Sequence, residues 1–401
     1  MLCQLFLIFT ITFSINVPAW SKSSSIVFLL QDQRGKIIVE KNSKERFNPA
    51  STLKILTSLV ALKTLGENYR FKTEFYLSNQ NDLKIKGYGD PFLISEIWNK
   101  LAKKISNKVK TINNIFIDDS FFARHIKIPG IGSSLNPYDA PVGALCVNFN
   151  TFYVKKVRNK FVSAEPQTPL IPFVQAQIKK MHIKKTGRYV ISHKIRVAEK
   201  YAGELFKYFL IAHGTKVKGK IGFDSVSPKD KLVYSYYSDL SLKEIVKKMM
   251  RYSNNFIANQ IVLVLGAEFY GAPATMQKGL SVIKNYAREK LGLKDTTIVE
   301  GSGISRQNLI SCRDMIIILR NFIPYMNLLK KKDNMYYKTG TLKGINTRAG
   351  YIIGKNNTYI FVLFLRGKPQ TADHFLSYMS HCLSPFSFHN ASFSPEDLMI
   401  R

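Results

Sequence analysis

Cysteine, tryptophan and acidic residues are scarce in this sequence. Its 401 residues include four Cys, two Trp and 27 Asp and Glu, against 59 Lys and Arg. So few cysteines exclude a small scaffold held together by disulfides. The shortage of acids leaves a formal net charge of +32, which bears on solubility and on encounters with polyanions but leaves the fold open.

Metal-binding patterns are missing as well. The seven His residues form no H-E-x-x-H motif and no Cys/His spacing that would hold zinc. We therefore predict no metal site and no cofactor. Beyond the N-terminus, no apolar run approaches the roughly 18 residues that a membrane-spanning helix needs, so we expect no span in the rest of the chain.

The sequence is rich in core-forming residues instead. Hydrophobic residues make up 45% of the chain and aromatic residues 12%, which predicts a folded protein with a large interior. At about 150 residues per domain, the length favours two or three domains.

The N-terminus predicts export. Residues 5–15 are almost unbroken apolar sequence, the length of the hydrophobic region of a signal peptide, and Ala19 and Ser21 are small residues before a cleavage point. We predict a signal peptide over 1–21 and a mature protein in the periplasm or on the exterior of the cell envelope. Residues 1–4 lack the usual Lys or Arg, which a misassigned start codon would explain.

Three cysteines remain after Cys3 leaves with the signal peptide. Cys146, Cys312 and Cys382 cannot all pair with one another. Because free Cys is among the most buried residue types, at least one is expected in the core, while one disulfide remains possible.

The positive charge is spread along the chain. It includes Lys100, Lys103, Lys104, Lys108, Lys110 and residues 330–332, with no Arg-rich arm and no C-x-x-C finger. We predict no nucleic-acid binding and expect electrostatic contact with an anionic wall or membrane surface. A Lys-rich composition without a dedicated partner is the alternative.

Apolar spacing predicts a hairpin, a buried helix and a C-terminal sheet. Strands are expected at 25–30 and 36–40, and the helix at 51–65 has apolar residues on nearly every face. Further helices are expected at 96–105, 197–213, 242–251, 256–265, 277–291, 309–322 and 371–383, and further strands at 336–342, 347–353 and 359–365. Residues 73–239, with only the first two of those helices, indicate an inserted mixed region.

A serine and a lysine lie one turn apart at the start of the buried helix. In Ser51-Thr52-Leu53-Lys54 the two side chains share a helix face. A Ser hydroxyl becomes a good nucleophile when a base takes its proton, and burial lowers the pKa of a Lys toward the working range. The alternative is a helix cap with a Lys that reaches solvent, and the same spacing at Ser281 and Lys284 carries no predicted role.

Two further motifs strengthen the interpretation of Ser51 and Lys54 as catalytic residues. Ser253-Asn254-Asn255 lies in the joint between two predicted helices, and Lys338-Thr339-Gly340-Thr341 lies on a strand of the terminal sheet. Together, S-x-x-K, S-x-N and K-T-G mark penicillin-binding proteins and class A β-lactamases. Ser253 and Asn255 can relay a proton and hold a substrate amide. Lys338 supplies positive charge, and Gly340 lets the strand approach a substrate edge-on.

A second pair of similar motifs offers an alternative trio with Ser51. These motifs are Ser134-Leu135-Asn136 and Lys185-Thr186-Gly187. The first runs into Pro137 with no helix after it, and the second lies in a Lys-rich stretch. We therefore favour the later pair of motifs, which have the helix joint and the strand in the expected places.

The ordered motifs resemble those of the low-molecular-mass class C penicillin-binding proteins, exported D-alanyl-D-alanine carboxypeptidases and endopeptidases of bacterial peptidoglycan. The similar segments are Pro49-Ala-Ser-Thr-Leu-Lys54, Leu83-Lys-Ile-Lys-Gly-Tyr-Gly-Asp-Pro91, Glu300-Gly-Ser-Gly-Ile-Ser-Arg306, and Lys338-Thr-Gly-Thr-Leu-Lys-Gly344 followed by Ala349-Gly-Tyr351. The long insertion between the first two catalytic motifs is also similar to this class and unlike β-lactamases. Glu300 stands where the family usually has Asp.

The resemblance implies an α/β (α+β) fold. A β-lactamase/transpeptidase-like catalytic domain, an antiparallel sheet flanked by helices, would combine residues 22–72 and 240–401. Residues 73–239 would form one or two inserted mixed α/β accessory domains. The implied activity is that of a serine D-alanyl-D-alanine carboxypeptidase acting on peptidoglycan stem peptides, with D,D-endopeptidase activity in addition, and with β-lactam antibiotics as covalent inhibitors.

Residue roles follow from the same resemblance. Ser51 would attack the carbonyl between the two terminal D-alanines, with Lys54 as its base. Ser253 and Asn255 would assist proton transfer and substrate binding.

The strand motif would bind the substrate's terminal carboxylate. The residues implied are Lys338, Thr339 and Thr341, beside Gly340, and the backbone N–H groups of Ser51 and Thr341 would form the oxyanion hole. Arg348 on the adjacent strand is a candidate for carboxylate binding, but we favour its interpretation as an exposed surface residue.

Two other functions stay open at this point. One is a β-lactamase, which the long insertion and the lack of a recognisable deacylating Glu motif disfavour. The other is a non-catalytic module that binds peptidoglycan or senses β-lactams. An intact set of Ser, Lys and Asn residues disfavours it, because such residues serve no purpose unless chemistry uses them.

Overall fold

The structure is a computed structural model that describes residues 26–355 and 357–383, so the predicted signal peptide lies outside the described residues. The helices are α1 (Lys54–Thr64), α2 (Ser95–Lys108), α3 (Pro172–Lys180), α4 (Ile195–Ala212), α5 (Leu242–Tyr252), α6 (Asn255–Tyr270), α7 (Met276–Glu289), α8 (Cys312–Phe322) and α9 (Pro369–Cys382). The strands are β1 (Ile26–Asp32), β2 (Ile37–Lys41), β3 (Lys72–Leu77), β4 (Leu83–Gly87), β5 (Thr111–Ile112), β6 (Ile115–Asp118), β7 (Thr151–Val157), β8 (Lys160–Ser163), β9 (Gly187–Val190), β10 (Lys216–Val217), β11 (Ile221–Phe223), β12 (Lys231–Tyr237), β13 (Lys330–Lys332), β14 (Met335–Leu342), β15 (Ile345–Ile353) and β16 (Thr358–Arg366).

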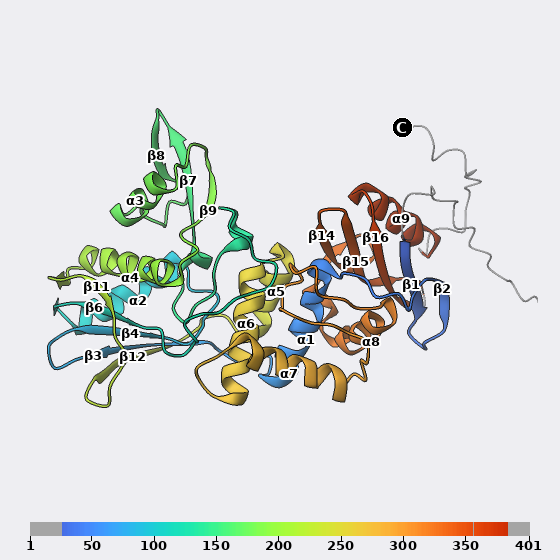
Figure 1. Ribbon diagram of the computed structural model, residues 1–401, viewed down its shortest axis with the longest axis horizontal. Coiled ribbons are helices and arrows are strands. Elements are labelled where there is room, and N and C mark those ends of the chain that lie inside the picture. The colour runs from blue at the N-terminus through green and yellow to red at the C-terminus, as the bar shows by residue number, and fades with distance from the viewer. Residues whose placement is uncertain (1–25, 356, 384–401) are drawn as a thin grey trace, which may run out of the picture.

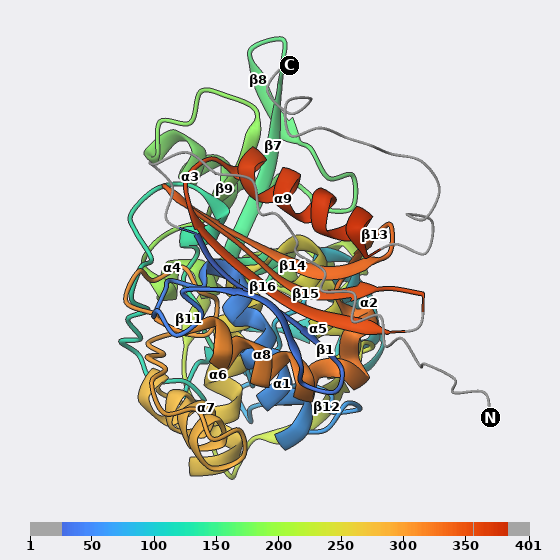
Figure 2. The same cartoon turned by 90° about the vertical axis from the view of Figure 1, so that its right-hand side faces the viewer.

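A six-stranded antiparallel sheet joins the two ends of the described chain. Its order is β13-β14-β15-β16-β1-β2. Because side chains alternate along a strand, Val27 and Leu29 of β1 face the helices on one side, while Phe28 and Leu30 pack under α9 on the other. Figure 2 shows α9 and α8 on opposite faces of this sheet.

The predicted buried helix lies at the centre of the helical layer. Every residue of α1 from Lys54 to Leu62 is buried, and the helix contacts α5, α6, α7 and α8. The prediction of a buried helix is therefore confirmed, because a helix with apolar residues on nearly every face needs packing partners on every side.

Residues between β3 and β12 form the other part of the molecule (Figure 1). A mixed sheet of order β11-β6-β4-β3-β12 carries α2 and α4, and the small sheet β8-β7-β9 lies beside α3. Trp98 of α2 is fully buried and donates its indole N–H to the carbonyl of Ala202 in α4. Strands β3 and β12 pair so that Lys72 lies opposite Tyr237, and the chain therefore enters and leaves this part side by side.

The helices and strands expected from the sequence are all present close to their predicted bounds. The structure adds α3 and β13, and it shows that the inserted region, expected only to be mixed, contains the strands β3–β12. Only Val174 and Ile178 among the nine residues of α3 are buried. So short an apolar stripe gives little periodic signal in the sequence.

The sequence predicted no further membrane span and no metal site, and it left one disulfide open. Within 26–355 and 357–383, no helix is long and apolar enough to cross a membrane, and no group of His, Cys, Asp and Glu is placed to hold a metal ion. Cys146 and Cys312 are both free and buried, so neither belongs to a disulfide.

Close contact between α6 and α7 yields a stability prediction. A Cβ at Gly279 would overlap the backbone carbonyl of Val262, so Gly279→Ala should force the two helices apart and cost about 1–3 kcal/mol. The midpoint of thermal unfolding should fall, whereas Lys284→Ala, at an exposed position of the same helix, should leave it nearly unchanged. An equal midpoint for the two variants would contradict this account of the packing.

Candidate active site

The predicted nucleophile lies where the helical layer meets strand β14, because the turn that carries it contacts that strand. Ser51 is in a short 3₁₀ turn (Ala50–Leu53) that leads directly into α1. Ala50 holds a φ of 45°, a left-handed conformation that is costly for a residue other than Gly. Asn48 supports it, because its side-chain oxygen accepts the Ala50 backbone N–H at 3.0 Å.

Lys54 lies under Ser51 with no exposure to solvent. Its Nζ is 3.1 Å from the Ser51 Oγ and 2.7 Å from the Asn255 Oδ1. The carbonyl oxygen of Ser302 completes the set at 2.6 Å. Three partners therefore fix the amine in a single position beside the hydroxyl.

Burial lowers the pKa of Lys54 well below the usual lysine value, and the positive charge of Lys338 lowers it further. The carboxylate of Glu300 acts in the opposite direction. An amine that holds its proton weakly can accept one from Ser51, because a general base works best with a pKa near the operating pH.

A second lysine and serine lie next to this pair. Ser253 ends α5 in the left-handed conformation, with a φ of 53°, which turns its side chain toward β14. Lys338 donates from Nζ to the Ser253 Oγ at 2.9 Å and to the Thr339 carbonyl at 2.7 Å. Burial, followed by the nearby Arg348, lowers the pKa of Lys338 to about 7.

Strand β14 passes against the backbone of Ser51. A Cβ at Gly340 would lie 2.8 Å from the Ser51 backbone nitrogen and would overlap the Thr347 hydroxyl. Only glycine permits so close an approach. Thr339 and Thr341, which alternate with the buried Lys338 and Gly340, are exposed, so their hydroxyls are free to meet a ligand along the strand.

The loop that supplies the Ser302 carbonyl is built around one buried carboxylate. Glu300 has no solvent exposure. It accepts hydrogen bonds from the backbone N–H groups of Ser302, Gly303 and Ser305, the Ser302 hydroxyl, and the side-chain amides of Asn259 and Asn308. Because all these groups donate, the site requires an acceptor-only side chain.

Sequence reasoning gave this segment as similar to the family and missed what the loop does. The conspicuous residues were the glycines of Gly301-Ser302-Gly303, and Glu300 was noted only as a departure from the family pattern. Gly303 has a φ of 81°, and a Cβ there would overlap the Ala50 carbonyl, so the loop packs directly on the turn that carries Ser51.

The alternative motifs are not part of this cluster. The Ser134 hydroxyl donates to Asp139 at 2.6 Å within its own loop. Lys185 and Thr186 are exposed before β9, and Thr186 bonds to the backbone of Lys156. The structure therefore brings the later motifs, and not the earlier ones, to Ser51.

The interpretation of Arg348 as an exposed surface residue is wrong. It is 4% exposed, and its guanidinium pairs with Asp373 of α9 at 2.9 and 3.0 Å. The register that places Arg348 opposite Thr339 also brings its charge close to Lys338, which explains its effect on the pKa of that lysine. A strand pattern cannot show that a helix from the end of the chain covers this position.

The comparisons with known proteins agree with this geometry. A sequence profile of the D-Ala-D-Ala carboxypeptidase 3 (S13) family matches residues 14–188 and 183–331. The chain is 24% identical over 417 residues to the D-alanyl-D-alanine carboxypeptidase DacB of Haemophilus influenzae, covering 86% of each protein. It is also 24% identical over 426 residues to a D-alanyl-D-alanine carboxypeptidase of Actinomadura sp. (strain R39), covering 87% of this chain and 79% of the relative.

Solved structures share the fold. Penicillin binding protein 4 (dacB) of H. influenzae matches with a TM-score of 0.74 at 20% identity, covering 90% of this chain and 97% of that chain. A predatory peptidoglycan endopeptidase from Bdellovibrio bacteriovorus matches with a TM-score of 0.57 at 17% identity, covering 92% and 96%. The predicted β-lactamase/transpeptidase-like fold is confirmed.

The position of Glu300 yields a prediction about pH. Its charge raises the pKa of Lys54, so Glu300→Gln should lower that pKa further. With Ser51 as the predicted nucleophile and Lys54 as its predicted base, the rate of covalent reaction should rise with pH as Lys54 loses its proton, and in the variant this rise should begin at lower pH. Its plateau should also fall, because the amide N–H groups of Gln oppose the surrounding donors.

The pH profile of acylation by benzylpenicillin measures this effect. Glu289→Gln, which removes the same charge from the exposed end of α7, is the matched control and should keep the original profile. If Glu300→Gln lowered the rate without moving the rising limb, Glu300 would only hold the loop in place.

Proposed function

Because the chain belongs to the D-Ala-D-Ala carboxypeptidase 3 (S13) family, we propose that it hydrolyses peptidoglycan stem peptides as a serine D-alanyl-D-alanine carboxypeptidase, through an acyl-enzyme on Ser51. The observation that carries the residue assignment is the buried amine of Lys54. It contacts the Ser51 hydroxyl, while Lys338 and Ser253 are paired beside it.

In the proposed first step, Lys54 takes the proton of the Ser51 hydroxyl as Oγ attacks the carbonyl between the terminal D-alanines. The C–O bond that forms makes a tetrahedral oxyanion, for which the backbone N–H groups of Ser51 and Thr341 are the proposed donors. When the C–N bond breaks, the leaving amine of D-alanine needs a proton. The Ser253 hydroxyl, bonded to Lys338, is placed to relay it.

Substrate binding is assigned to the strand motif and to Asn255. The charge of Lys338 and the exposed hydroxyls of Thr339 and Thr341 suit the terminal carboxylate of the peptide. The Asn255 side chain, whose oxygen accepts from Lys54, has an amide group left to hold the substrate backbone. Water activated by the same groups then releases the acyl group and restores the Ser51 hydroxyl.

Endopeptidase activity and β-lactam inhibition fit the same chemistry. A carboxypeptidase releases a free D-alanine, and an endopeptidase releases a crosslinked side chain, so the two reactions differ only in the leaving amine. The B. bacteriovorus endopeptidase has the same fold. The H. influenzae protein forms a complex with a β-lactam, and the proposed nucleophile would open a β-lactam ring by the same attack.

Acylation by benzylpenicillin tests the assignment. Intact-mass analysis over time should show one stable adduct, which peptide mapping should locate on Ser51. Lys54→Ala should slow its formation by a factor on the order of 10³, and Lys338→Ala should also slow it. Lys185→Ala, in the alternative K-T-G motif, is the control and should react like the unaltered protein.

The same time course separates the alternatives. Rapid loss of the antibiotic without a lasting adduct would indicate a β-lactamase, and no reaction would indicate the non-catalytic module. If Lys185→Ala abolished the adduct and Lys338→Ala did not, the choice between the two K-T-G motifs would be overturned. Release of D-alanine from a pentapeptide then tests the carboxypeptidase reaction itself.

We also propose the arrangement of the mature protein in the envelope. After loss of residues 1–21, the chain would act in the periplasm or outside the cell. Residues 22–72 with 240–401 would form the catalytic domain and 73–239 the accessory part, a division supported by the pairing of β3 with β12. The charge of +32 would hold the enzyme against the anionic wall or membrane surface.

Salt tests the electrostatic contact. Binding of the protein to isolated cell-wall sacculi should weaken as NaCl rises from about 50 to 500 mM, because the screening length falls from about 14 to 4 Å over this range. The Ser51→Ala variant keeps the sacculi intact during the measurement. Binding that does not change with salt would rule out charge as the means of attachment.

A further inference from the structure

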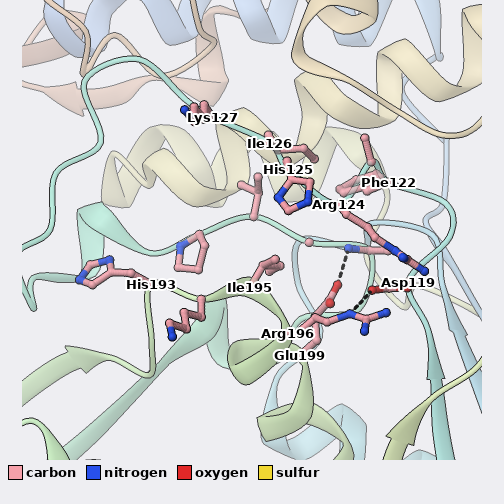
Figure 3. A pocket seen from close by; sticks show the side chains of 16 residues that line it. Asp119, Phe122, Arg124, His125, Ile126, Lys127, His193, Ile195, Arg196 and Glu199 are labelled. Atoms are coloured by element: carbon pink, nitrogen blue, oxygen red, sulfur yellow. Dashed lines mark hydrogen bonds and ion pairs between the residues drawn. The ribbon is translucent and has the colours of Figure 1, made fainter.

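A cavity lies in the inserted part of the chain, and its lining includes none of the proposed catalytic or substrate-binding residues. Its volume is about 550 Å³, and it is lined by residues of the segments 119–127, 141–144 and 193–199. Figure 3 shows side chains of these segments around it. All the lining residues belong to the inserted part of the chain.

Cationic side chains outnumber acidic ones in the cavity wall. The cations are Arg124, Lys127, Lys194 and Arg196, and the acids are Asp119 and Glu199. Arg196 is engaged, since it pairs with Asp119 at 3.3 Å and lies over the Phe223 ring. No hydrogen bond or ion pair to the other three cationic side chains occurs among the described residues, and all three are exposed. They remain available to an anion from solution.

One of the acids that line the cavity, Glu199, is buried. Glu199 is 2% exposed, and its Oε1 accepts the backbone N–H groups of Ala144 and Leu145 at 3.0 and 3.5 Å. Its other oxygen, Oε2, has no partner among the residues that the structure describes. A Cβ at Gly143 would lie 2.7 Å from Oε1, so this glycine lets the loop close over one side of the carboxyl group and leaves the other toward the cavity.

The protonation of Glu199 decides what it can bind. Burial, and after it the charge of Asp119, raises its pKa to about 8, although the backbone N–H groups of Leu145 and Ala144 and the charge of Arg196 act in the opposite direction. Near pH 7 the group is therefore mainly a neutral carboxylic acid, whose O–H is a hydrogen-bond donor. The buried thiol of Cys146, whose pKa burial raises, also lies close to Glu199. Two further titratable groups, His125 and His193, line the same cavity.

The remaining lining is apolar. Phe122, Ile126, Val142 and Ile195 contribute to the wall between the cationic rim and the acid. Such a mixture suits an organic ion better than a bare inorganic one, because the apolar body of the ligand leaves water as its charged group meets the cations.

We propose that this cavity binds a small organic oxyanion, a carboxylate or phosphate on a short apolar body, held by Arg124, Lys127 and Lys194 and hydrogen-bonded by Glu199. The site is separate from the cluster of residues around Ser51 and does not depend on the function proposed for that cluster. A carboxylate would come from a peptide and a phosphate from another envelope polymer or a metabolite, and two matched probes distinguish these sources.

Calorimetric titration of the full protein with hippurate and with phenyl phosphate tests the proposal. These probes carry a carboxylate and a phosphate, respectively, on the same aromatic ring. The triple variant Arg124→Gln, Lys127→Gln, Lys194→Gln should bind the preferred probe at least about tenfold more weakly. The control is Lys155→Gln, Lys156→Gln, Arg158→Gln, which removes the same charges from exposed positions around the β7–β8 turn and should retain the original affinity.

Equal weakening in both triple variants would show that the net charge of the protein attracts the probes without a site, and no binding of either probe at millimolar concentration would also overturn the proposal. Preference for hippurate would identify peptide carboxylates as the ligand class, and preference for phenyl phosphate would identify phosphates.

Glu199→Gln provides a second readout. Gln keeps an acceptor for Ala144 and Leu145 and a donor toward the cavity, as the neutral acid does. Between pH 7.5 and 9.5, above the ordinary range of histidine, hippurate affinity should fall by about tenfold in the original protein, because Glu199 loses its proton. It should stay level in Glu199→Gln. The same decline in both proteins would show that Glu199 does not contact the ligand.

Discussion

The burial of Lys54 is the constraint on which the proposed chemistry depends. An amine removed from water loses its preference for the charged form, and the lowered pKa that follows suits Lys54 to its proposed role as the base. Burial also requires partners for its polar atoms. Three are supplied, by the turn at Ser51, by the first residue of α6 at Asn255, and by the loop at Ser302. The position of the base is thus set by three segments that are far apart in the sequence.

The loop at Ser302 and the strand beside Ser51 are themselves held in place by close contacts. The loop at Ser302 is ordered by the carboxylate of Glu300, which accepts from the loop's own backbone. Strand β14 reaches the Ser51 amide because residue 340 is glycine. A site assembled this way is rigid before a ligand arrives, and preorganised dipoles stabilise a developing charge without the reorganisation that solvent would need.

Much of the fold and of the site could be predicted because the sequence signals were local. A helix that is apolar on all faces, an alternating strand and a glycine after a helix each report on their own neighbourhood. The three motifs around Ser51, Ser253 and Lys338 were recognisable because each lies within four residues. The prediction was incomplete for α3, whose apolar stripe is too short to recognise, and wrong for Arg348, because a helix from another part of the chain covers it.

The sequence by itself determined the residue types and the order of the motifs, and with them the family and the class of reaction. Only the tertiary structure decided which of two K-T-G motifs meets Ser51, how strongly Lys54 and Lys338 are desolvated, and that Glu300 organises the loop beneath them. It alone placed Glu199 against a cationic cavity. The physical reason is that burial, and the shift in protonation that burial causes, depends on every segment that packs around a group, and no local pattern records that packing.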